Sequence, residues 1–258
     1  MQYGFRHARS TADVLTVISH RISEALDSTY DARTIALDIS KAFDQVWHKG
    51  LLHKLSSYGI SGRIYSIIKS FRSSRSMKVV VNGQSSKVHA INAGVPQGSV
   101  LGPTLFLIFI NDLPDRVIRS FINIFADDTT IYGTTSKNLN HSDLAPNLSS
   151  DLSVIVQWGT KWLVRFNASK TKLITFHHYR GTPVFPPVTM GGTMLDESPS
   201  LDKILGLKFT PHTNKEYCIN ILKEEDLFML DEAFALRNTL SETEESVLYY
   251  ISGYVAKK

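Results

Sequence analysis

The sequence predicts an α+β fold, in which an antiparallel sheet is backed by helices. Short apolar runs with β-prone residues alternate with stretches whose apolar residues recur at helical spacing. Several strand candidates follow one another through tight turns, which favours antiparallel hairpins over a doubly wound parallel sheet. The chain has 258 residues, of which 43% are apolar, so it is long enough to bury a sizeable core.

The first quarter of the chain is expected to form one strand and three helices. A helix is predicted over residues 11–26, where apolar side chains fall on one face. Residues 34–39 (TIALDI) are mostly apolar and predict a buried central strand with an acid near its end. Further helices are expected over 44–58 and 61–70, with Gly59 as a stop between them.

A hairpin and a loop rich in glycine and proline are predicted next. Residues 77–81 and 87–91 are predicted to be the strands of a hairpin, joined around Asn82-Gly83, a common hairpin turn pair. The loop covers residues 94–103 (GVPQGSVLGP) and leads into a strongly apolar helix over 104–112.

The remaining elements are less regular. A weaker helix is expected over 148–163, and the segment 215–258 is expected to be mainly helical. Strands are predicted over residues 121–126, 129–132, 172–176 and 204–209.

Charge and composition suggest an intracellular protein with a polyanionic partner. From Lys215 onward there are five Lys/Arg and nine Asp/Glu, a net charge of −4, so the chain's total of +4 leaves +8 on the first 214 residues. The single cysteine, Cys218, cannot form an internal disulfide, which suits a cytoplasmic or nuclear location. The longest apolar run, 105–110, is too short to span a bilayer, so no membrane partner is expected. No partner protein is evident.

Three acidic residues are the candidate centre of chemistry. Asp127 and Asp128 lie between two short strands, where a hairpin turn is the simplest interpretation. Asp38 ends another apolar strand, where a helix cap or a surface charge would be ordinary. If the strands are neighbours in one sheet, three carboxylates meet at one edge and suit magnesium ions. Two such ions can assist phosphoryl transfer. On these residues alone, a nuclease or a phosphatase fits as well as a polymerase.

The order of the surrounding motifs narrows these options. The motifs occupy residues 2–6 (QYGFR) with Ser10-Thr11, 36–44 (ALDISKAFD), 94–103 (GVPQGSVLGP), 125–128 (FADD), 167–171 (NASKT) and 205–207 (LGL). In this order they resemble the reverse transcriptases of non-LTR (LINE-type) retrotransposons. The resemblance spans residues 2–210, about four fifths of the chain. A lone pair of aspartates has little specificity, whereas six motifs at plausible spacing are highly specific.

The resemblance implies a right-hand polymerase palm with partial fingers, formed by residues 1–210. It implies an RNA-directed DNA polymerase that adds dNTPs to a DNA primer paired with an RNA or DNA template. The matched region begins inside the fingers, and no thumb is matched after Leu207. We therefore expect residues 211–258 to be a helical acidic tail of separate origin, since 245–258 faintly resembles P-element-like transposases. An alternative is an inactive retrotransposon remnant that at most binds nucleic acid.

The resemblance also assigns roles to residues around the three aspartates. Asp38, the carbonyl of Ile39, Asp127 and Asp128 are implied to hold two Mg²⁺ ions, for which Mn²⁺ can substitute. The aspartates are implied to be catalytic. Lys170 is implied to act as an acid toward the pyrophosphate leaving group, although a solvated surface lysine is an equal alternative.

Further residues are implied to bind the nucleotide and the primer. Phe43 matches a steric gate that disfavours ribonucleotides, with an ordinary core phenylalanine as the alternative. Arg6 is implied to reach the triphosphate, although any surface arginine would look the same in the sequence. The remaining residues implied to line the nucleotide site are Gln97, Gly98 and Ala126, and those implied to hold the primer are Leu205, Gly206 and Leu207.

Overall fold

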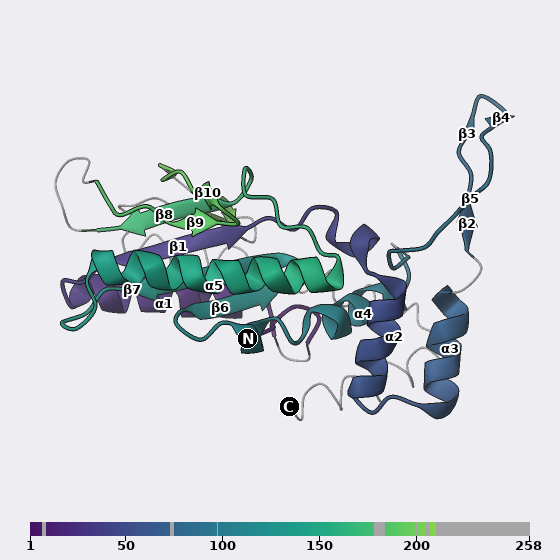
Figure 1. Ribbon diagram of the computed structural model, residues 1–258, viewed down its shortest axis with the longest axis horizontal. Helices are drawn as coiled ribbons and strands as arrows, with labels where there is room; N and C mark the ends of the chain where they lie inside the picture. Colours follow the sequence, from purple (N-terminus) through teal and green to yellow (C-terminus); the bar gives the residue numbers. More distant parts are fainter. Residues whose placement is uncertain are drawn as a thin grey trace. The chain divides into compact units, whose positions relative to one another are not determined.

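The fold is taken from a computed structural model, which describes residues 1–6, 9–72, 75–96, 98–177, 184–199, 201–204 and 207–209. The chain divides into two units (Figure 1), each of which is described by itself. The first unit contains Met1–Ser40, Asn111–Lys161 and the described part of Arg165–Leu240. The second contains the described residues of Lys41–Ile110 together with Trp162–Val164.

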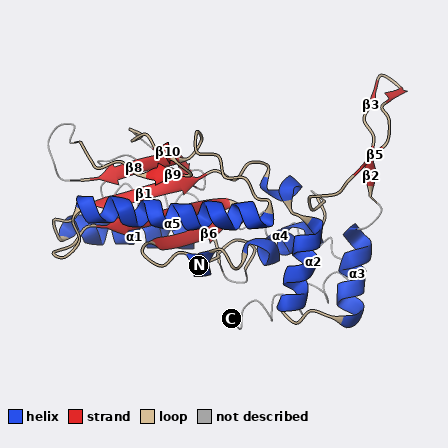
Figure 2. Cartoon of the chain, in the orientation of Figure 1, coloured by secondary structure: helices blue, strands red, loops and turns tan. Residues whose placement is uncertain are grey.

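A four-stranded antiparallel sheet forms the centre of the first unit (Figure 2). Its strands are β6 (Phe121–Phe125), β7 (Asp128–Thr134), β1 (Ala32–Leu37) and β8 (Lys172–Phe176), in that spatial order. All four were predicted near these positions, and the antiparallel pairing is confirmed. The strand β1 lies between β7 and β8 in this sheet and is buried along almost its whole length.

Helices cover both faces of this sheet. The helix α1 (Thr11–Asp27) packs through Leu15 and Ile18 into a cluster that includes Tyr132 of β7. Gly133, the next residue of β7, points to the opposite face because side chains alternate along a strand. There a Cβ at Gly133 would lie 2.6 Å from Leu144 Cδ1 of α5, so a glycine is needed for the close approach.

The helix α5 (His141–Trp162) begins earlier than the predicted start at residue 148. The Asn140 side chain accepts a hydrogen bond from the Asp143 N–H at 3.1 Å and caps the helix. Pro146 lies inside the helix but is exposed, so a carbonyl that lacks an intrahelical donor there can bind water. The predicted start at residue 148 is therefore wrong, because the helix continues through Pro146 to its cap at Asn140.

Helices dominate the second unit. The predicted helices are confirmed as α2 (His48–Ser57), α3 (Gly62–Arg72) and α4 (Leu101–Ile110), with a short 3₁₀ helix η1 (Ala42–Gln45) before them. The helix α4 begins and ends earlier than the predicted span of 104–112. Leu51, Ile68 and Leu105 are fully buried, one from each helix, and mark the core of this unit.

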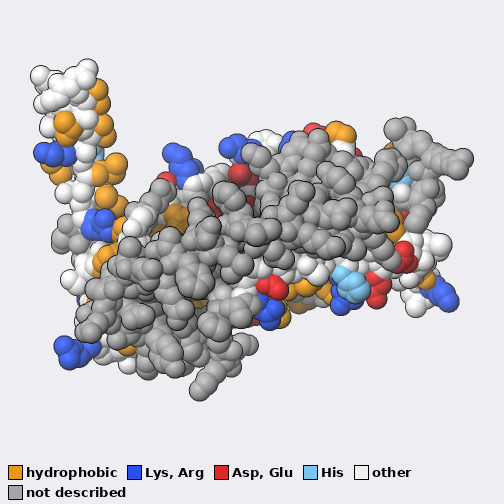
Figure 3. Space-filling view, turned by 180° about the vertical axis from the view of Figure 1, so that it is seen from behind, with side chains coloured by type: hydrophobic (Ala, Val, Ile, Leu, Met, Phe, Trp, Pro, Cys, Tyr) orange, Lys and Arg blue, Asp and Glu red, His pale blue; other side chains and the backbone are white. Residues whose placement is uncertain are grey.

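A long hairpin precedes α4, as predicted. The strands β2 (Ser76–Met77) and β5 (His89–Ala90) pair at its base, and β3 (Val80–Val81) and β4 (Gln84–Ser85) pair near its tip. Asn82 and Gly83 both have positive φ, 49° and 78°, as a two-residue hairpin turn requires. Apolar and basic side chains are exposed along this hairpin (Figure 3), the large apolar ones being Met77, Val79, Val80, Val81 and Val88.

The C-terminal part departs most from prediction. The hairpin of β9 (Thr189–Met190) and β10 (Thr193–Met194) was not predicted. The predicted strand 204–209 is wrong, because β11 (Leu201–Ile204) and β12 (Leu207–Phe209) are two strands that pair with each other. The expected tail over 211–258 lies outside the described residues. No helix in the described part of the chain is long and apolar enough to cross a membrane.

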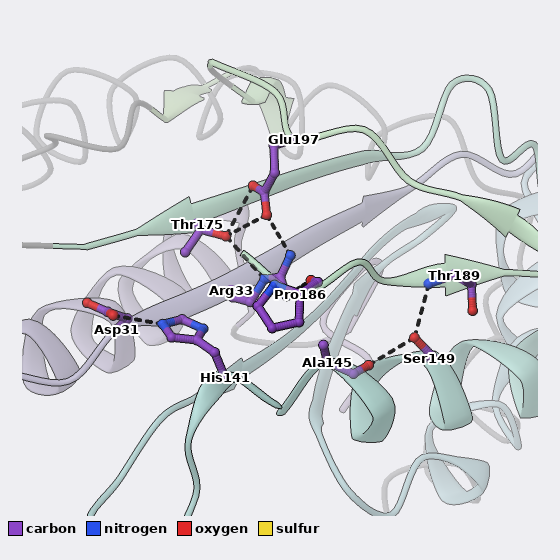
Figure 4. Close-up of polar contacts among 9 residues, drawn as sticks. All are labelled: Asp31, Arg33, His141, Ala145, Ser149, Thr175, Pro186, Thr189 and Glu197. Atoms are coloured by element: carbon purple, nitrogen blue, oxygen red, sulfur yellow. Dashed lines mark hydrogen bonds and ion pairs between the residues drawn. The ribbon is translucent and has the colours of Figure 1, made fainter. Parts of the chain in front are cut away.

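A buried ionic cluster ties β1 to the segment after β8 (Figure 4). Arg33 of β1 is only 1% exposed, and its Nη2 lies 2.5 Å from Glu197 Oε1. Its Nε donates to Thr175 Oγ1 at 3.1 Å and its Nη1 to the Pro186 carbonyl at 2.7 Å. Burial lowers the pKa of Arg33, and the charge of Glu197 opposes that change. The guanidinium thus remains charged because each nitrogen has an acceptor.

We predict that removing only the negative partner of this pair is costly. In Glu197→Gln the Arg33 charge stays buried without compensation, so the free energy of unfolding should fall by about 2 kcal/mol, less than for a fully buried pair because Glu197 is 39% exposed. The double variant Arg33→Met/Glu197→Gln should recover most of this loss. Urea unfolding measures both, with Glu24→Gln at the exposed Arg21–Glu24 pair as the control, expected to change by less than about 0.5 kcal/mol. A larger loss in the double variant than in Glu197→Gln would contradict the prediction.

Candidate active site

The turn between β6 and β7 presents two of the three candidate carboxylates. Phe125 pairs with Asp128 across the hairpin, so Ala126 and Asp127 form a two-residue turn. Ala126 has φ +55°, a left-handed conformation that is unfavourable for a residue with a Cβ and typical of tight hairpins. The turn therefore exposes the Asp127 side chain and places Asp128 at the first position of β7.

The sheet register brings Asp38 to the same edge. Leu37, the last residue of β1, pairs with Thr129 of β7. Because the strands are antiparallel, the next residue on β1, Asp38, lies opposite Asp128. The register therefore brings Asp38, Asp127 and Asp128 to the same edge of the sheet, as the sequence predicted.

The backbone of Asp38 is fixed by a turn that follows α5. The Asn167 N–H donates to the Asp38 carbonyl at 2.9 Å, and the Asp38 N–H donates to Thr171 Oγ1 at 3.4 Å. Thr171 in turn donates through its own N–H to the Asn167 carbonyl at 2.9 Å, which closes the turn. Asn167 and Thr171, at the two ends of this turn, therefore hold the backbone of Asp38 in place.

Electrostatics at this edge are unfavourable for three ionised carboxylates. Partial burial raises the pKa of Asp128 to about 6, and the charges of Asp127 and Asp38 add to the increase. Asp38 Oδ2 is buried and has no hydrogen-bond partner among the described residues. A buried carboxylate oxygen without a donor is costly, so both features favour a cation at this edge.

The other predicted metal ligand, the Ile39 carbonyl, lies beside Asp38. Ile39 forms an antiparallel bridge with Phe166. The bonds of that bridge use the Asp38 carbonyl and the Ser40 N–H, on either side of Ile39. Within the part of the chain that the structure describes, no three His, Cys, Asp or Glu side chains converge closely enough to form a ready metal cage.

Lys170 belongs to the turn that holds Asp38. Its N–H donates to the Asn167 carbonyl at 3.2 Å, and its side chain is exposed. Ser169 reinforces the turn, since its N–H and hydroxyl both donate to Asn167 Oδ1, at 3.1 and 2.7 Å. The structure therefore brings the Lys170 backbone near the aspartate edge, while the ammonium group points into solvent.

Phe43 and the glycine-rich loop belong to the second unit, where the structure brings them together. Phe43 is half-buried and stacks on Phe106 of α4, with ring centroids 4.6 Å apart. The Val95 N–H donates to the Phe43 carbonyl at 2.9 Å. Gly94 has φ +88° and lies against the Asp44 backbone, where a Cβ would be 3.0 Å from the Asp44 carbonyl oxygen. The close approach needs glycine at this position.

Other predicted site residues are placed less favourably or lie outside the described residues. Arg6 donates through Nη2 to Asn111 Oδ1 at 3.2 Å, and burial, followed by repulsion from Arg9, lowers its pKa. The arginine therefore has a partner within the protein. Gly98 is exposed with φ +76°. Gln97, Leu205 and Gly206 lie outside the described residues, and of Leu207 only its place in β12 is described.

Sequence reasoning gave no role to Gln2, which the structure places under the Ala126–Asp127 turn. Gln2 is 5% exposed, and its Oε1 accepts hydrogen bonds from the N–H groups of Gly4 and Ala126 at 2.8 and 3.1 Å. Gln2 is the first residue of the motif at residues 2–6 (QYGFR), but the motif does not reveal a hydrogen-bond partner more than a hundred residues away.

We predict that ionisation of Asp128 destabilises the metal-free protein. The pKa of Asp128 is about 6 in the folded protein and 3.8 for an ordinary aspartate. Between these two values the folded state binds more protons than the unfolded state, so stability falls as the pH rises through this window. Asp128→Asn should therefore raise the free energy of unfolding at pH 7.5 in a chelating buffer, and the gain should shrink toward pH 4.5. Urea unfolding at both pH values measures this. Asp127→Asn should lower the Asp128 pKa in a carbon-13 NMR titration, and an unchanged pKa would contradict the proposed cause.

Comparison with known proteins shows which family the chain is similar to. The chain matches the reverse transcriptase (RNA-dependent DNA polymerase) family over residues 1–217. It is 36% identical over 201 residues to the RNA-directed DNA polymerase from mobile element jockey of Drosophila melanogaster, covering 75% of this chain and 21% of that protein. It is 31% identical over 210 residues to the probable RNA-directed DNA polymerase from transposon X-element of the same species, covering 80% and 22%. The chain thus spans about a fifth of the length of these relatives.

A solved structure supports the fold. An apo telomerase from Candida tropicalis, truncated from its C-terminal domain, superposes with a TM-score of 0.54 at 14% identity, covering 81% of this chain and 39% of the telomerase. Together with the antiparallel sheet and its helices, this likeness confirms the predicted α+β, palm-like fold. From the match over residues 1–217, the chain belongs to the reverse transcriptase family.

Proposed function

We propose that this chain is the polymerase core of a reverse transcriptase of the non-LTR retrotransposon type. It would add dNTPs to the 3′-OH of a DNA primer on an RNA or DNA template. The observation that carries the proposal is the meeting of Asp38, Asp127 and Asp128 at one sheet edge in a chain of this family. Its relatives are named as polymerases of mobile elements, which supports the retrotransposon origin.

The residues at the edge fit two Mg²⁺ ions, which Mn²⁺ could replace. Asp38 offers a buried oxygen without a donor, and Asp128 is held among like charges that a cation would neutralise. Asp38, Asp127 and the Ile39 carbonyl would be the ligands, with Asp128 less directly bound. When bound, the ions would activate the primer hydroxyl and stabilise the charge of the leaving pyrophosphate. The protein contributes a fixed edge, since hydrogen bonds hold the backbone of Asp38 on both sides.

Lys170 would donate a proton to the departing pyrophosphate. Its turn is closed by hydrogen bonds to Asn167, and the same turn fixes Asp38, so the lysine and the carboxylate share one support. The exposed side chain is long enough to move toward a bound substrate. This shared support is what favours a catalytic role over that of an ordinary surface lysine.

The second unit would supply the nucleotide pocket. Phe43 stacks on Phe106 and is held by Val95, so its ring is fixed while part of it stays accessible. A fixed ring at the sugar would clash with a ribose 2′-OH. Gln97 and Gly98 would contact the nucleotide from the adjacent loop, with Ala126 under the primer end and Arg6 toward the triphosphate.

Template and primer binding is supported by the charge of the second unit. The stretch Lys41–Ile110 contains nine Lys/Arg and a single acid, Asp44, a net charge of +8. Such a surplus neutralises phosphates without reading sequence. Leu205, Gly206 and Leu207 would hold the primer strand. A tail of separate origin over 211–258 also remains a proposal, and the family match extends to residue 217, seven residues into it. An intracellular location is likewise a proposal.

The central test is extension of a DNA primer on an RNA template with Mg²⁺ or Mn²⁺. We expect the chain to extend the primer and Asp127→Asn to reduce the rate by at least about a thousandfold, because the proposed metal ligand is lost. The matched control is Asp115→Asn, which removes an exposed acid from the short helix η2 (Pro114–Arg116) and should leave the rate within about twofold.

The same assay separates the two candidate functions. Salt-dependent binding of the primer–template without extension would favour the inactive remnant that only binds nucleic acid. Extension that is equal in the chain and in Asp127→Asn would exclude the proposed metal site.

Sugar selection provides an independent check of the second unit. In Phe43→Val the smaller side chain should admit a ribose, so incorporation of rNTPs relative to dNTPs should rise by at least about tenfold. The ratio of kcat/KM values for rNTP and dNTP measures this. An unchanged ratio with an intact dNTP rate would show that Phe43 is only a core residue that packs on Phe106.

A further inference from the structure

The N-terminal segment lies directly beneath the turn that carries the candidate metal ligands. Gln2 forms a parallel bridge with Ile124 of β6, and the Tyr3 N–H donates to the Ile124 carbonyl at 2.7 Å. The Ile124 N–H donates to the Met1 carbonyl at 2.9 Å. The segment is therefore a short extra strand beside β6, and it ends where the Ala126–Asp127 turn begins.

The side chain of Gln2 reaches this turn with a defined orientation. Gly4 and Ala126 each present a backbone N–H to it, at 2.8 and 3.1 Å. Two donors can be satisfied only by the amide oxygen, so the chemistry itself excludes the flipped amide. The Nε2 group is then buried with no partner among the described residues. The amide thus leaves its own donors unsatisfied while its oxygen accepts from the turn.

The Ala126–Asp127 turn needs such support. Ala126 has φ +55°, a conformation that an alanine adopts only when its surroundings hold it there. Repulsion among Asp38, Asp127 and Asp128 also favours opening of the turn. The hydrogen bond from the Ala126 N–H to Gln2 Oε1 opposes both the backbone strain and the repulsion. Opening the turn would break this buried hydrogen bond.

Gly4 lets the backbone come close enough for this contact. A Cβ at Gly4 would collide with the Ala126 nitrogen and crowd the carbonyl carbon of Phe125. The neighbouring backbone could not move away as the end of a flexible side chain could. The pair of Gln2 and Gly4 therefore forms a bracket, with one residue bonding the turn and the other making room for it.

We propose that Gln2 is a positioning residue that holds the Ala126–Asp127 turn in its left-handed form and thereby sets the divalent-cation affinity of the aspartate edge. The relevance of this role to catalysis rests on the proposed function. Gln2 accepts hydrogen bonds from the backbone N–H groups of Gly4 and Ala126, so its effect on the aspartate edge would pass through the Ala126–Asp127 turn.

The first measurement is hydrogen exchange of the Ala126 amide in the full metal-free chain. In Gln2→Leu the acceptor is lost, and exchange should become about fivefold faster. Gln2→Glu keeps an acceptor oxygen at the same place and should retain protection close to that of the unchanged chain. Gln157→Leu, at an exposed position of α5, is the matched control and should have no effect on this amide. Equal exchange in Gln2→Leu and the unchanged chain would overturn the proposal.

The second measurement is the Mn²⁺ dissociation constant, followed by the free-ion electron paramagnetic resonance signal. In Gln2→Leu we expect it to rise by about tenfold, as when other supports of metal ligands are removed. Ile174→Val removes a buried methyl group from β8, so it lowers stability without touching the turn. If Ile174→Val weakens Mn²⁺ binding as much as Gln2→Leu does, Gln2 has only a structural role and the proposal is wrong.

Both readouts are independent of polymerisation. If the chain fails to extend a primer but Gln2→Leu still loosens the amide and weakens Mn²⁺ binding, the proposed function fails and the positioning role stands. If extension succeeds while neither readout changes in Gln2→Leu, the positioning role fails by itself.

Discussion

The candidate site depends on the antiparallel register between β1 and β7. Leu37 pairs with Thr129, and this single alignment places Asp38 opposite Asp128. A slip of one residue would turn every side chain of β1 to the other face of the sheet. Because β1 is buried on both faces between β7 and β8, such a slip would also bury the wrong side chains around Arg33 and would be strongly disfavoured.

The same register that forms the candidate site also brings three negative charges close together, which is energetically unfavourable. Three carboxylates at one edge repel one another, and the pKa of Asp128 rises to about 6 as a result of burial and this repulsion. The protein opposes the cost through its backbone, because no cationic side chain is paired with these aspartates among the described ion pairs. Asn167 and Thr171 hold Asp38, while Gln2 holds the turn before Asp128. Neutral hydrogen bonds fix the geometry and leave the carboxylates available for a cation.

The sequence predicted what depends on local pattern and missed what depends on distant partners. The strands around Asp127 and Asp128 follow from short apolar runs, and the three aspartates from their positions at strand ends. The start of α5 was missed because the capping by Asn140 outweighs an exposed Pro146. The burial of Arg33 could not be predicted, because its acceptors lie more than 140 residues away. Gln2 was missed for the same reason.

Charge is distributed unevenly along the chain. The stretch Lys41–Ile110 carries +8 whereas the whole chain carries +4, so the rest of the chain has a net charge of −4. A polyphosphate is attracted to the first of these regions over distances of roughly 10 Å at moderate salt. Phosphates would instead be repelled by the carboxylates of Asp38, Asp127 and Asp128, and a cation at the proposed metal site would offset that repulsion. Under the proposed function, salt would therefore act mainly on nucleic-acid affinity and the divalent cation mainly on turnover, because the two would depend on different charges of the same chain.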